Sequence, residues 1–173
     1  MMTLGVVLAK RKTPRAAVIP YLIIDDVIYF LLGTDKVSGD LTDLGGGVKK
    51  GEFALLAALR EFREESDEVF GDIYHDVNQR LIDIAVTDEK MSVLFLPVGK
   101  EWYKKAPQEF AKRVGYSKKK AHDEISELVW VKDTEFRDVT SKNGRMWRRL
   151  KCFYSRNYTE KLLCALKIRY ALL

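Results

Sequence analysis

Residues 45–70 read GGGVKKGEFALLAALREFREESDEVF and join a glycine-rich loop to an amphipathic segment. Apolar side chains recur every three or four positions after Glu52, which predicts a helix over 52–70 that ends at Gly71. Its core face would consist of Leu55, Leu59, Phe62, Ser66 and Val69. The acidic side chains fall on the other side of the helix, and these are Glu61, Glu64, Glu65 and Glu68.

The acidic flank of this helix indicates a bound cation. Its glutamates repel one another, and Arg60 and Arg63 neutralise only part of their charge. A hard divalent ion such as Mg²⁺ or Mn²⁺ would compensate the rest, because such ions prefer oxygen ligands. The alternative is a solvated helix face. The glycines at 45–47 and Gly51 favour the ion, since a glycine-rich loop beside carboxylates suits a diphosphate held by metal and backbone together.

The spacing of residues in this stretch resembles the Nudix box. The pattern of that family is G-x5-E-x7-R-E-U-x-E-E-x-G-U, where U is a bulky apolar residue. Seven of the nine fixed positions match, namely Gly46, Glu52, Arg60, Glu61, Phe62, Glu64 and Glu65. At the other two positions, the chain has Asp67 and Glu68 where the family has glycine and an apolar residue. We therefore predict that the helix runs past these positions to Gly71.

The resemblance implies a metal-dependent pyrophosphohydrolase that cleaves the diphosphate linkage of a nucleoside diphosphate joined to another moiety, X. Its cofactor would be Mg²⁺ or Mn²⁺. The implied metal ligands are Glu61, Glu64, Glu65 and the backbone carbonyl near Gly46, and the implied cofactor-binding loop is Gly45, Gly46 and Gly47. The metal would neutralise charge on the bridging phosphates and lower the pKa of a bound water, which then attacks phosphorus.

The resemblance also implies roles for the remaining catalytic residues. Glu52 would pair with Arg60 and thereby set the loop against the helix. Glu64 or Glu65 could orient or deprotonate the attacking water. In several relatives the general base comes from a later loop, and here Asp123, Glu124 and Glu127 precede an apolar strand over 128–131. Glu124 or Glu127 is therefore a further candidate, unless these carboxylates only balance the lysines at 118–120.

The rest of the chain alternates between predicted strands and helices. Two β-branched runs, 16–24 and 27–32, flank Asp25-Asp26 and predict a hairpin. The other predicted elements are strands over 81–86 and 91–98 with Pro97 at an edge or strand end, a helix over 100–113, a short strand over 128–131, and closing helices over 145–152 and 158–172. This order indicates one α+β domain over 1–173. The resemblance implies a Nudix-like α/β/α sandwich with a mixed sheet and a loop–helix–loop catalytic motif.

Charge is divided unevenly along the chain. Residues 1–98 hold 11 basic and 16 acidic side chains, a net charge of −5, whereas residues 99–173 hold 19 basic and 9 acidic side chains, a net charge of +10. The basic side chains could bind phosphates, and Trp102, Tyr116 or Trp147 could stack on a base. The candidate contacts for a substrate or RNA are Tyr116, Lys118, Lys119 and Lys120. The alternative is a solvated loop and a basic closing helix.

Three functions are compatible with these observations. The first is a small-molecule pyrophosphohydrolase acting on nucleotides, dinucleoside polyphosphates or nucleotide sugars. The second is an mRNA-decapping enzyme, as in the viral type of Nudix hydrolase, acting on capped RNA. The third is an inactive Nudix scaffold that binds nucleotides, which we disfavour because no box glutamate is missing. We prefer the first function to the second, because one aromatic residue among many lysines is a weak RNA signature.

The composition excludes several other classes of protein. No apolar run approaches the roughly 18 residues that a membrane span requires, so we expect no membrane partner. The cysteines, Cys152 and Cys164, and the histidines, His75 and His122, lack the spacing of a zinc site or a disulfide framework. Residues 1–9 make a poor signal peptide, and we therefore expect a cytoplasmic protein with reduced thiols.

Overall fold

The computed structural model describes residues 2–3, 13–71, 84–114, 124–140, 144–146, 154 and 160–172. The strands are β1 (Met2–Thr3), β2 (Arg15–Ile24), β3 (Val27–Asp35), β4 (Leu41–Thr42), β5 (Leu44–Gly47), β6 (Ile84–Thr87), β7 (Met91–Pro97) and β8 (Ile125–Lys132). The helices are α2 (Ala54–Glu65), α4 (Trp102–Arg113), α5 (Asp133–Thr140) and α7 (Glu160–Ala171).

These strands form one mixed sheet in the order β1-β6-β7-β2-β3-β4, with β5 added to β2 and β8 added to β3. The pairs are antiparallel except for β2 and β7, which run parallel over 15–21 and 91–97. Strand β7 and most of β2 are buried on both faces, as is typical of parallel strands that helices cover.

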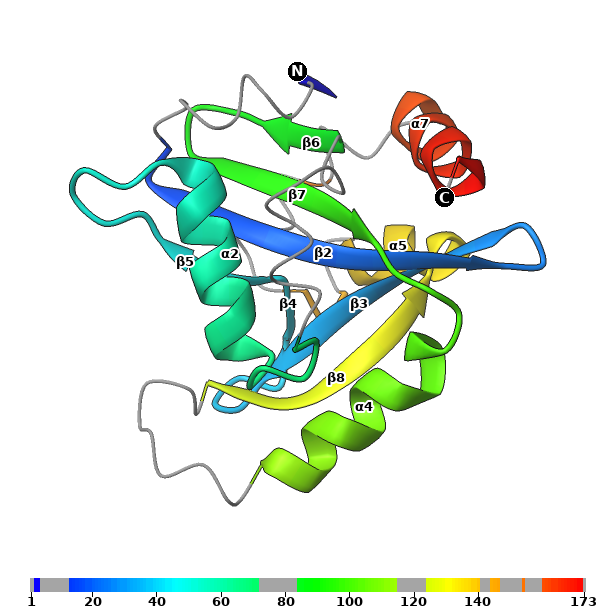
Figure 1. Ribbon diagram of the computed structural model, residues 1–173, viewed down its shortest axis with the longest axis horizontal. Helices are drawn as coiled ribbons and strands as arrows, with labels where there is room; N and C mark the ends of the chain where they lie inside the picture. Colours follow the sequence, from blue (N-terminus) through cyan, green and yellow to red (C-terminus); the bar gives the residue numbers. More distant parts are fainter. Residues whose placement is uncertain are drawn as a thin grey trace.

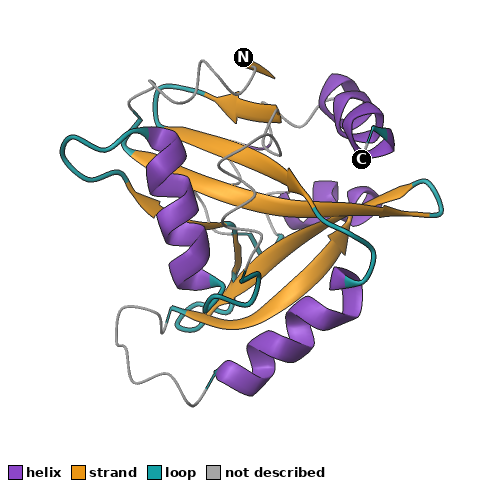
Figure 2. Ribbon diagram, in the orientation of Figure 1, coloured by secondary structure: helices purple, strands orange, loops and turns teal. Residues whose placement is uncertain are grey.

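Helices cover both faces of the sheet. Helices α2 and α4 pack into one apolar cluster, which includes Phe62 and Phe110, and helices α5 and α7 pack into a second, which includes Phe136 and Leu166. In the ribbon views α2 crosses in front of β2, whereas α5 lies behind it (Figure 1, Figure 2). This layered arrangement confirms the expected α+β class. Within the described ranges, no helix combines the length and the apolar character needed to cross a membrane.

Strand β2 has two different partners on the edge that faces away from β7. Residues 15–18 pair with β5, and residues 21–24 pair with β3. The register leaves Ile19 and Pro20 between the two partners, so this edge of β2 is forked. The first half of β2 thus pairs with the glycine-rich strand β5, and the second half pairs with β3 of the hairpin.

The hairpin predicted around Asp25-Asp26 is present. Strands β2 and β3 pair from Ile24 opposite Val27, and both aspartates have positive φ, 50° and 63°. A two-residue hairpin loop with positive φ at both positions matches the right-handed twist of the strands, and short polar side chains tolerate this conformation. The β-branched runs and their acidic turn thus predicted both strands.

The prediction that the helix continues to Gly71 is wrong. Helix α2 ends at Glu65, and the next residues close it in a Schellman motif: the Asp67 N–H donates to the Glu64 carbonyl (3.1 Å) and the Glu68 N–H to the Arg63 carbonyl (3.0 Å). Asp67 has φ of 49° and occupies the left-handed position that a glycine usually takes. The backbone therefore ends the helix where the family pattern has glycine, although this chain has aspartate.

The expected core face of this helix is only partly correct. Phe62, Ser66 and Val69 are buried, but Leu55 and Leu59 are half-buried. Three alanines take the central position against the sheet, and these are Ala54, Ala57 and Ala58. Because alanine side chains are small, the helix can approach β2 and β5 closely.

Several other elements also differ from the predictions. Residues 45–47, expected to form a loop, belong to strand β5, and strand β8 is longer than the predicted 128–131. Helix α5, over residues 133–140, was not predicted. Met146 bridges to Leu41 instead of starting a helix, and residues 147–152, 158–159 and 81–83 lie outside the described residues. The two strands that flank residues 88–90 are confirmed, with Pro97 as the last residue of β7. The helix predicted over 100–113 is also present, although it begins two residues later, at Trp102.

Candidate functional site

Arg60 is the centre of the contacts made by the box residues. Its Nε and Nη2 donate to the two carboxylate oxygens of Glu52 at 3.0 and 2.9 Å, and Nη2 also donates to the Gly47 carbonyl at 3.0 Å. Its Nη1 donates to Glu61 Oε1 at 2.5 Å and lies 3.5 Å from Glu64 Oε2. One guanidinium group therefore ties the glycine strand, the following loop and the acidic flank of α2 together.

Glu52 holds the loop between β5 and α2. Its carboxylate accepts hydrogen bonds from Arg60 and, at 3.0 Å, from the Lys49 N–H. The hydrogen bonds from Arg60 are the main cause that lowers the pKa of Glu52; burial opposes them, and the hydrogen bond from the Lys49 N–H adds to the lowering. The same pairing raises the pKa of Arg60. The contact that the resemblance implies between Glu52 and Arg60 is thus present.

Glu61 lies directly against the backbone of Gly46. A β-carbon added to Gly46 would overlap the carboxyl group of Glu61, so only glycine leaves this carboxyl group where it is. Gly46 also pairs in register with Ala16 of β2, which fixes the position of its backbone. Gly46 therefore acts through close approach, and its φ is not in the left-handed region.

Glu65 points away from Arg60 and toward β5. Its Oε2 accepts a hydrogen bond from the Gly45 N–H at 2.5 Å. Burial raises the pKa of Glu65 well above its ordinary value, and the negative charge of Asp43 adds to this rise. The positive charge of Arg15 and the hydrogen bond from Gly45 oppose it. Glu65 therefore occupies a very different environment from Glu64, which lies on the solvent side of the same helix turn.

Arg15 and Asp43 form an ion pair that sequence reasoning missed. Arg15 Nη2 donates to Asp43 Oδ1 at 2.8 Å, and the Asp43 side chain is completely buried. Burial raises the pKa of Asp43, and the adjacent guanidinium opposes that rise. One signal was available: Asp43 interrupts the run Leu41–Leu44, whose apolar neighbours indicate a buried position. Its partner is 28 residues away, and no local pattern identifies it.

The carboxylates of the box are suitable ligands for a hard divalent ion, but their side chains are turned to protein partners. Within the described part of the chain, no three acidic, histidine or cysteine side chains are grouped closely enough to hold a metal. Glu61 and Glu64 contact Arg60, and Glu65 contacts Gly45. The donors fit Mg²⁺ or Mn²⁺ by their chemistry, because the three box carboxylates lie within about one turn of α2, and two of them, Glu61 and Glu65, lie against the glycine backbone of β5.

The later carboxylates lie on strand β8 or just before it, and both are exposed. Glu127 Oε1 accepts a hydrogen bond from Thr34 Oγ1 at 3.1 Å, and the Glu124 carbonyl accepts one from the Lys36 N–H at 2.8 Å. These contacts tie both residues to the end of β3 and not to α2. The role of Glu124 or Glu127 as general base stays a prediction.

The predicted substrate contacts mostly lie outside the described residues. These are Tyr116, Lys118, Lys119 and Lys120, together with Asp123 and Trp147. Trp102 is described and is a core residue, only 8% exposed, with its ring 4.7 Å from that of Phe70 and the Lys105 amine over it at 4.3 Å. This placement contradicts a role for Trp102 in stacking on a base.

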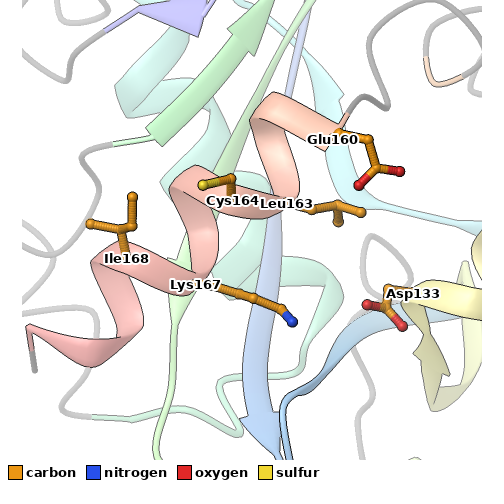
Figure 3. A pocket seen from close by; sticks show the side chains of 6 residues that line it. All are labelled: Asp133, Glu160, Leu163, Cys164, Lys167 and Ile168. Carbon is orange, nitrogen blue, oxygen red and sulfur yellow. The ribbon is translucent and has the colours of Figure 1, made fainter.

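A pocket of about 340 Å³ lies elsewhere, between α5 and α7. Figure 3 shows its six lining side chains, which are Asp133, Glu160, Leu163, Cys164, Lys167 and Ile168. Both helices pack on the face of the sheet opposite α2. None of the box residues lines this pocket, so it does not identify their substrate.

No protein-family model matches this chain, and no curated protein matches it either. Among solved structures, the chain is similar to a C. elegans Ap4A hydrolase binary complex, with 18% identity and a TM-score of 0.44 over 73% of this chain and 85% of that one. A second C. elegans Ap4A hydrolase structure has 14% identity and a TM-score of 0.41, over 74% of this chain and 86% of that one. A NUDIX-family hydrolase from Clostridium perfringens has 12% identity and a TM-score of 0.35, over 90% of this chain and 95% of that one. Function has to be inferred from the box residues and their contacts.

Proposed function

We propose that this chain is a Nudix-type hydrolase that cleaves the diphosphate linkage of a nucleoside diphosphate joined to a second moiety, X. The observation that carries the proposal is the box spacing together with its contacts. Arg60 joins Glu52, Glu61 and Glu64 to the carbonyl of Gly47, so the residues at the spacing of the box also make one connected set of contacts, which supports the proposal.

The proposed metal ligands are Glu61, Glu64, Glu65 and a backbone carbonyl near Gly46. A bound Mg²⁺ or Mn²⁺ supplies charge neutralisation on the bridging phosphates and a water of lowered pKa. The chain's own residues position these groups. Glu52 and Arg60 fix the loop against α2, and Gly46 leaves space for the Glu61 carboxyl group. Glu64 or Glu65 would orient the attacking water or accept its proton, and the exposure of the Glu64 side chain, 35%, favours Glu64.

The proposal is tested by a hydrolysis panel with and without EDTA. The substrates are nucleoside triphosphates, dinucleoside polyphosphates, ADP-ribose, diphosphoinositol phosphates and cap-labelled RNA. We expect turnover of at least one substrate that requires Mg²⁺ or Mn²⁺. We also expect Glu64→Gln and Glu65→Gln to abolish turnover and to leave the circular dichroism spectrum unchanged.

Glu109→Gln is the matched control for these variants. Glu109 is also a helical glutamate in an ion pair, with Lys112 at 2.8 Å, but it lies on α4 and outside the proposed site. We expect this variant to retain wild-type turnover. Catalysis that survives EDTA, or full activity of Glu64→Gln and Glu65→Gln, would exclude the proposed metal site.

Hydrolysis of capped RNA is a second candidate function, and the net charge of +10 over residues 99–173 favours it. A binder that uses several phosphate contacts loses affinity steeply as salt rises, whereas a small nucleotide held mainly by a metal responds weakly. Reversing Lys118, Lys119 and Lys120 to acidic residues should then impair RNA hydrolysis and spare free nucleotides. Equal loss on both substrates would contradict a separate RNA-binding surface.

A further inference from the structure

The buried ion pair of Arg15 and Asp43 lies on the strand pair that carries the glycines of the box. Arg15 begins β2 and is in register with Gly47, and Asp43 immediately precedes β5. Their side chains meet at 2.8 Å, with Asp43 fully buried and Arg15 about one-fifth exposed. The ion pair therefore joins the two strands over nearly the whole length of their ladder.

This strand pair determines where the Gly45 N–H points. Gly45 is opposite Ala17, and a β-carbon on Gly45 would overlap both the side chain and the backbone there. The Gly45 N–H faces away from β2 and donates to Glu65. A shift of β5 relative to β2 would move this donor, so the ion pair that clamps the strands also sets the position of the Glu65 carboxylate.

The charges around Glu65 lead to the same conclusion. Asp43 and Glu65 are both carboxylates in a buried region, and they repel each other. Arg15 attracts both of them, in addition to its hydrogen bond with Asp43. Without the guanidinium group, two carboxylates would remain close together in a region of low dielectric constant, where such repulsion is strong.

We propose that Arg15 and Asp43 are positioning residues that hold the Glu65 carboxylate where it can bind the divalent ion. This inference rests on the proposed function of Glu65 as a metal ligand. Partners behind the ligands of a metal orient those ligands, and their loss costs about 10- to 100-fold in metal affinity or activity. The alternative is that the pair only stabilises the fold.

The experiment separates these two roles by replacing both partners with apolar residues. Removing one partner alone leaves a buried charge and destabilises a protein, whereas replacing a buried pair with apolar residues of similar volume is often neutral or stabilising. We therefore expect Arg15→Met to lower Tm and the double variant Arg15→Met/Asp43→Leu to regain it. Mn²⁺ affinity, measured with the metal alone from the electron paramagnetic resonance of free Mn²⁺, should stay about 10- to 100-fold weaker in the double variant. Its kcat should fall similarly, with little change in KM.

Two further variants keep the test decisive. Arg15→Lys retains the positive charge, so it should bind Mn²⁺ more tightly than Arg15→Gln. This comparison of two single variants tests the inference even if the double variant does not fold. Lys167→Met breaks the ion pair with Asp26, which joins α7 to the hairpin tip at 2.9 Å, and it should leave Mn²⁺ affinity unchanged.

The inference is overturned if the double variant regains Tm and binds Mn²⁺ like the wild type, or if Arg15→Lys binds Mn²⁺ no better than Arg15→Gln. These results differ from a failure of the proposed function. A wild-type protein that binds Mn²⁺ but hydrolyses no substrate in the panel would contradict only the proposed activity, and the Mn²⁺ affinities of the variants would still decide this inference. A wild-type protein that binds no Mn²⁺ overturns both.

Discussion

Replacing Asp67 with glycine should stabilise the protein. Asp67 has φ of 49° at the end of α2, where an L-residue is in the left-handed region. That conformation costs a residue with a side chain about 1–2 kcal/mol. Glycine avoids this cost, but it lowers the stability by about 0.5–1 kcal/mol because it increases the conformational entropy of the unfolded chain. The Arg113 side chain donates to the main-chain carbonyl of Asp67, so this contact survives the substitution.

The difference predicts a gain of about 0–1.5 kcal/mol in the free energy of unfolding, with a midpoint of about 0.75 kcal/mol. For a chain of this size, the midpoint corresponds to a rise in Tm of about 1.5–3 °C. Thermal unfolding followed by circular dichroism, and urea unfolding at 25 °C, would both measure it. The expected order of Tm is Asp67→Gly above wild type, and wild type close to Asp67→Asn, because asparagine tolerates the left-handed region as aspartate does.

Glu89→Gly is the matched control for this prediction. Glu89 is an exposed acidic residue in the turn before β7, and its φ is not positive. Glycine there brings only the entropy cost and should lower the stability by about 0.5–1 kcal/mol. If Asp67→Gly lowered Tm as Glu89→Gly does, Asp67 would not be in the left-handed region, and the Schellman motif at the end of α2 would be refuted.

The glycines of β5 should respond differently to alanine. Gly46→Ala should displace the flexible Glu61 carboxyl group, so we expect weaker Mn²⁺ binding with little change in Tm, whereas Gly47→Ala, with open space around its added β-carbon, should change neither. Gly45→Ala meets the backbone of the opposite strand and should destabilise the fold by about 1–3 kcal/mol in urea unfolding. The stabilisation that Glu52 supplies should depend on pH: its pKa is lowered from 4.5 in the folded protein, so its contribution is present above the unfolded pKa and is lost as pH falls through the folded pKa. Glu52→Gln should therefore reduce the urea midpoint at pH 7 but not at pH 2, and an equal reduction at both values would contradict this linkage.

The sequence predicted those parts of the fold that local signals specify. The hairpin follows from two β-branched runs and an acidic turn, and the start of α2 follows from apolar periodicity. Residues 45–47 were wrongly predicted as a loop because glycine disfavours strands, and only their pairing with β2 makes them part of a strand. The end of α2 was wrongly predicted because Asp67 replaces the glycine of the family pattern, and this departure was interpreted as a continuing helix, whereas aspartate keeps the left-handed conformation here.

In the candidate site, too, only the contacts within one segment of sequence could be predicted. Spacing within one segment brought Glu52, Arg60 and the acidic flank of α2 together, because these residues belong to a single loop and helix. The ion pair between Arg15 and Asp43 could not be predicted, because it joins two strands that meet only in the folded sheet. Helix α5 was missed because the segment DTEFRDVT is short and mostly polar.

The forked edge of β2 also explains how a proline is accommodated inside a strand that has neighbours on both sides. The carbonyl of Tyr21 accepts a hydrogen bond from the Val98 N–H, so the amide of Tyr21 faces β7 and that of the preceding residue faces the opposite edge. On that edge Pro20 lies between the residues that pair with β5 and those that pair with β3, so its missing N–H falls where β2 is paired with neither strand. A proline within an unbroken β-branched run can therefore mark the place where a strand exchanges one neighbour for another, rather than the place where it stops.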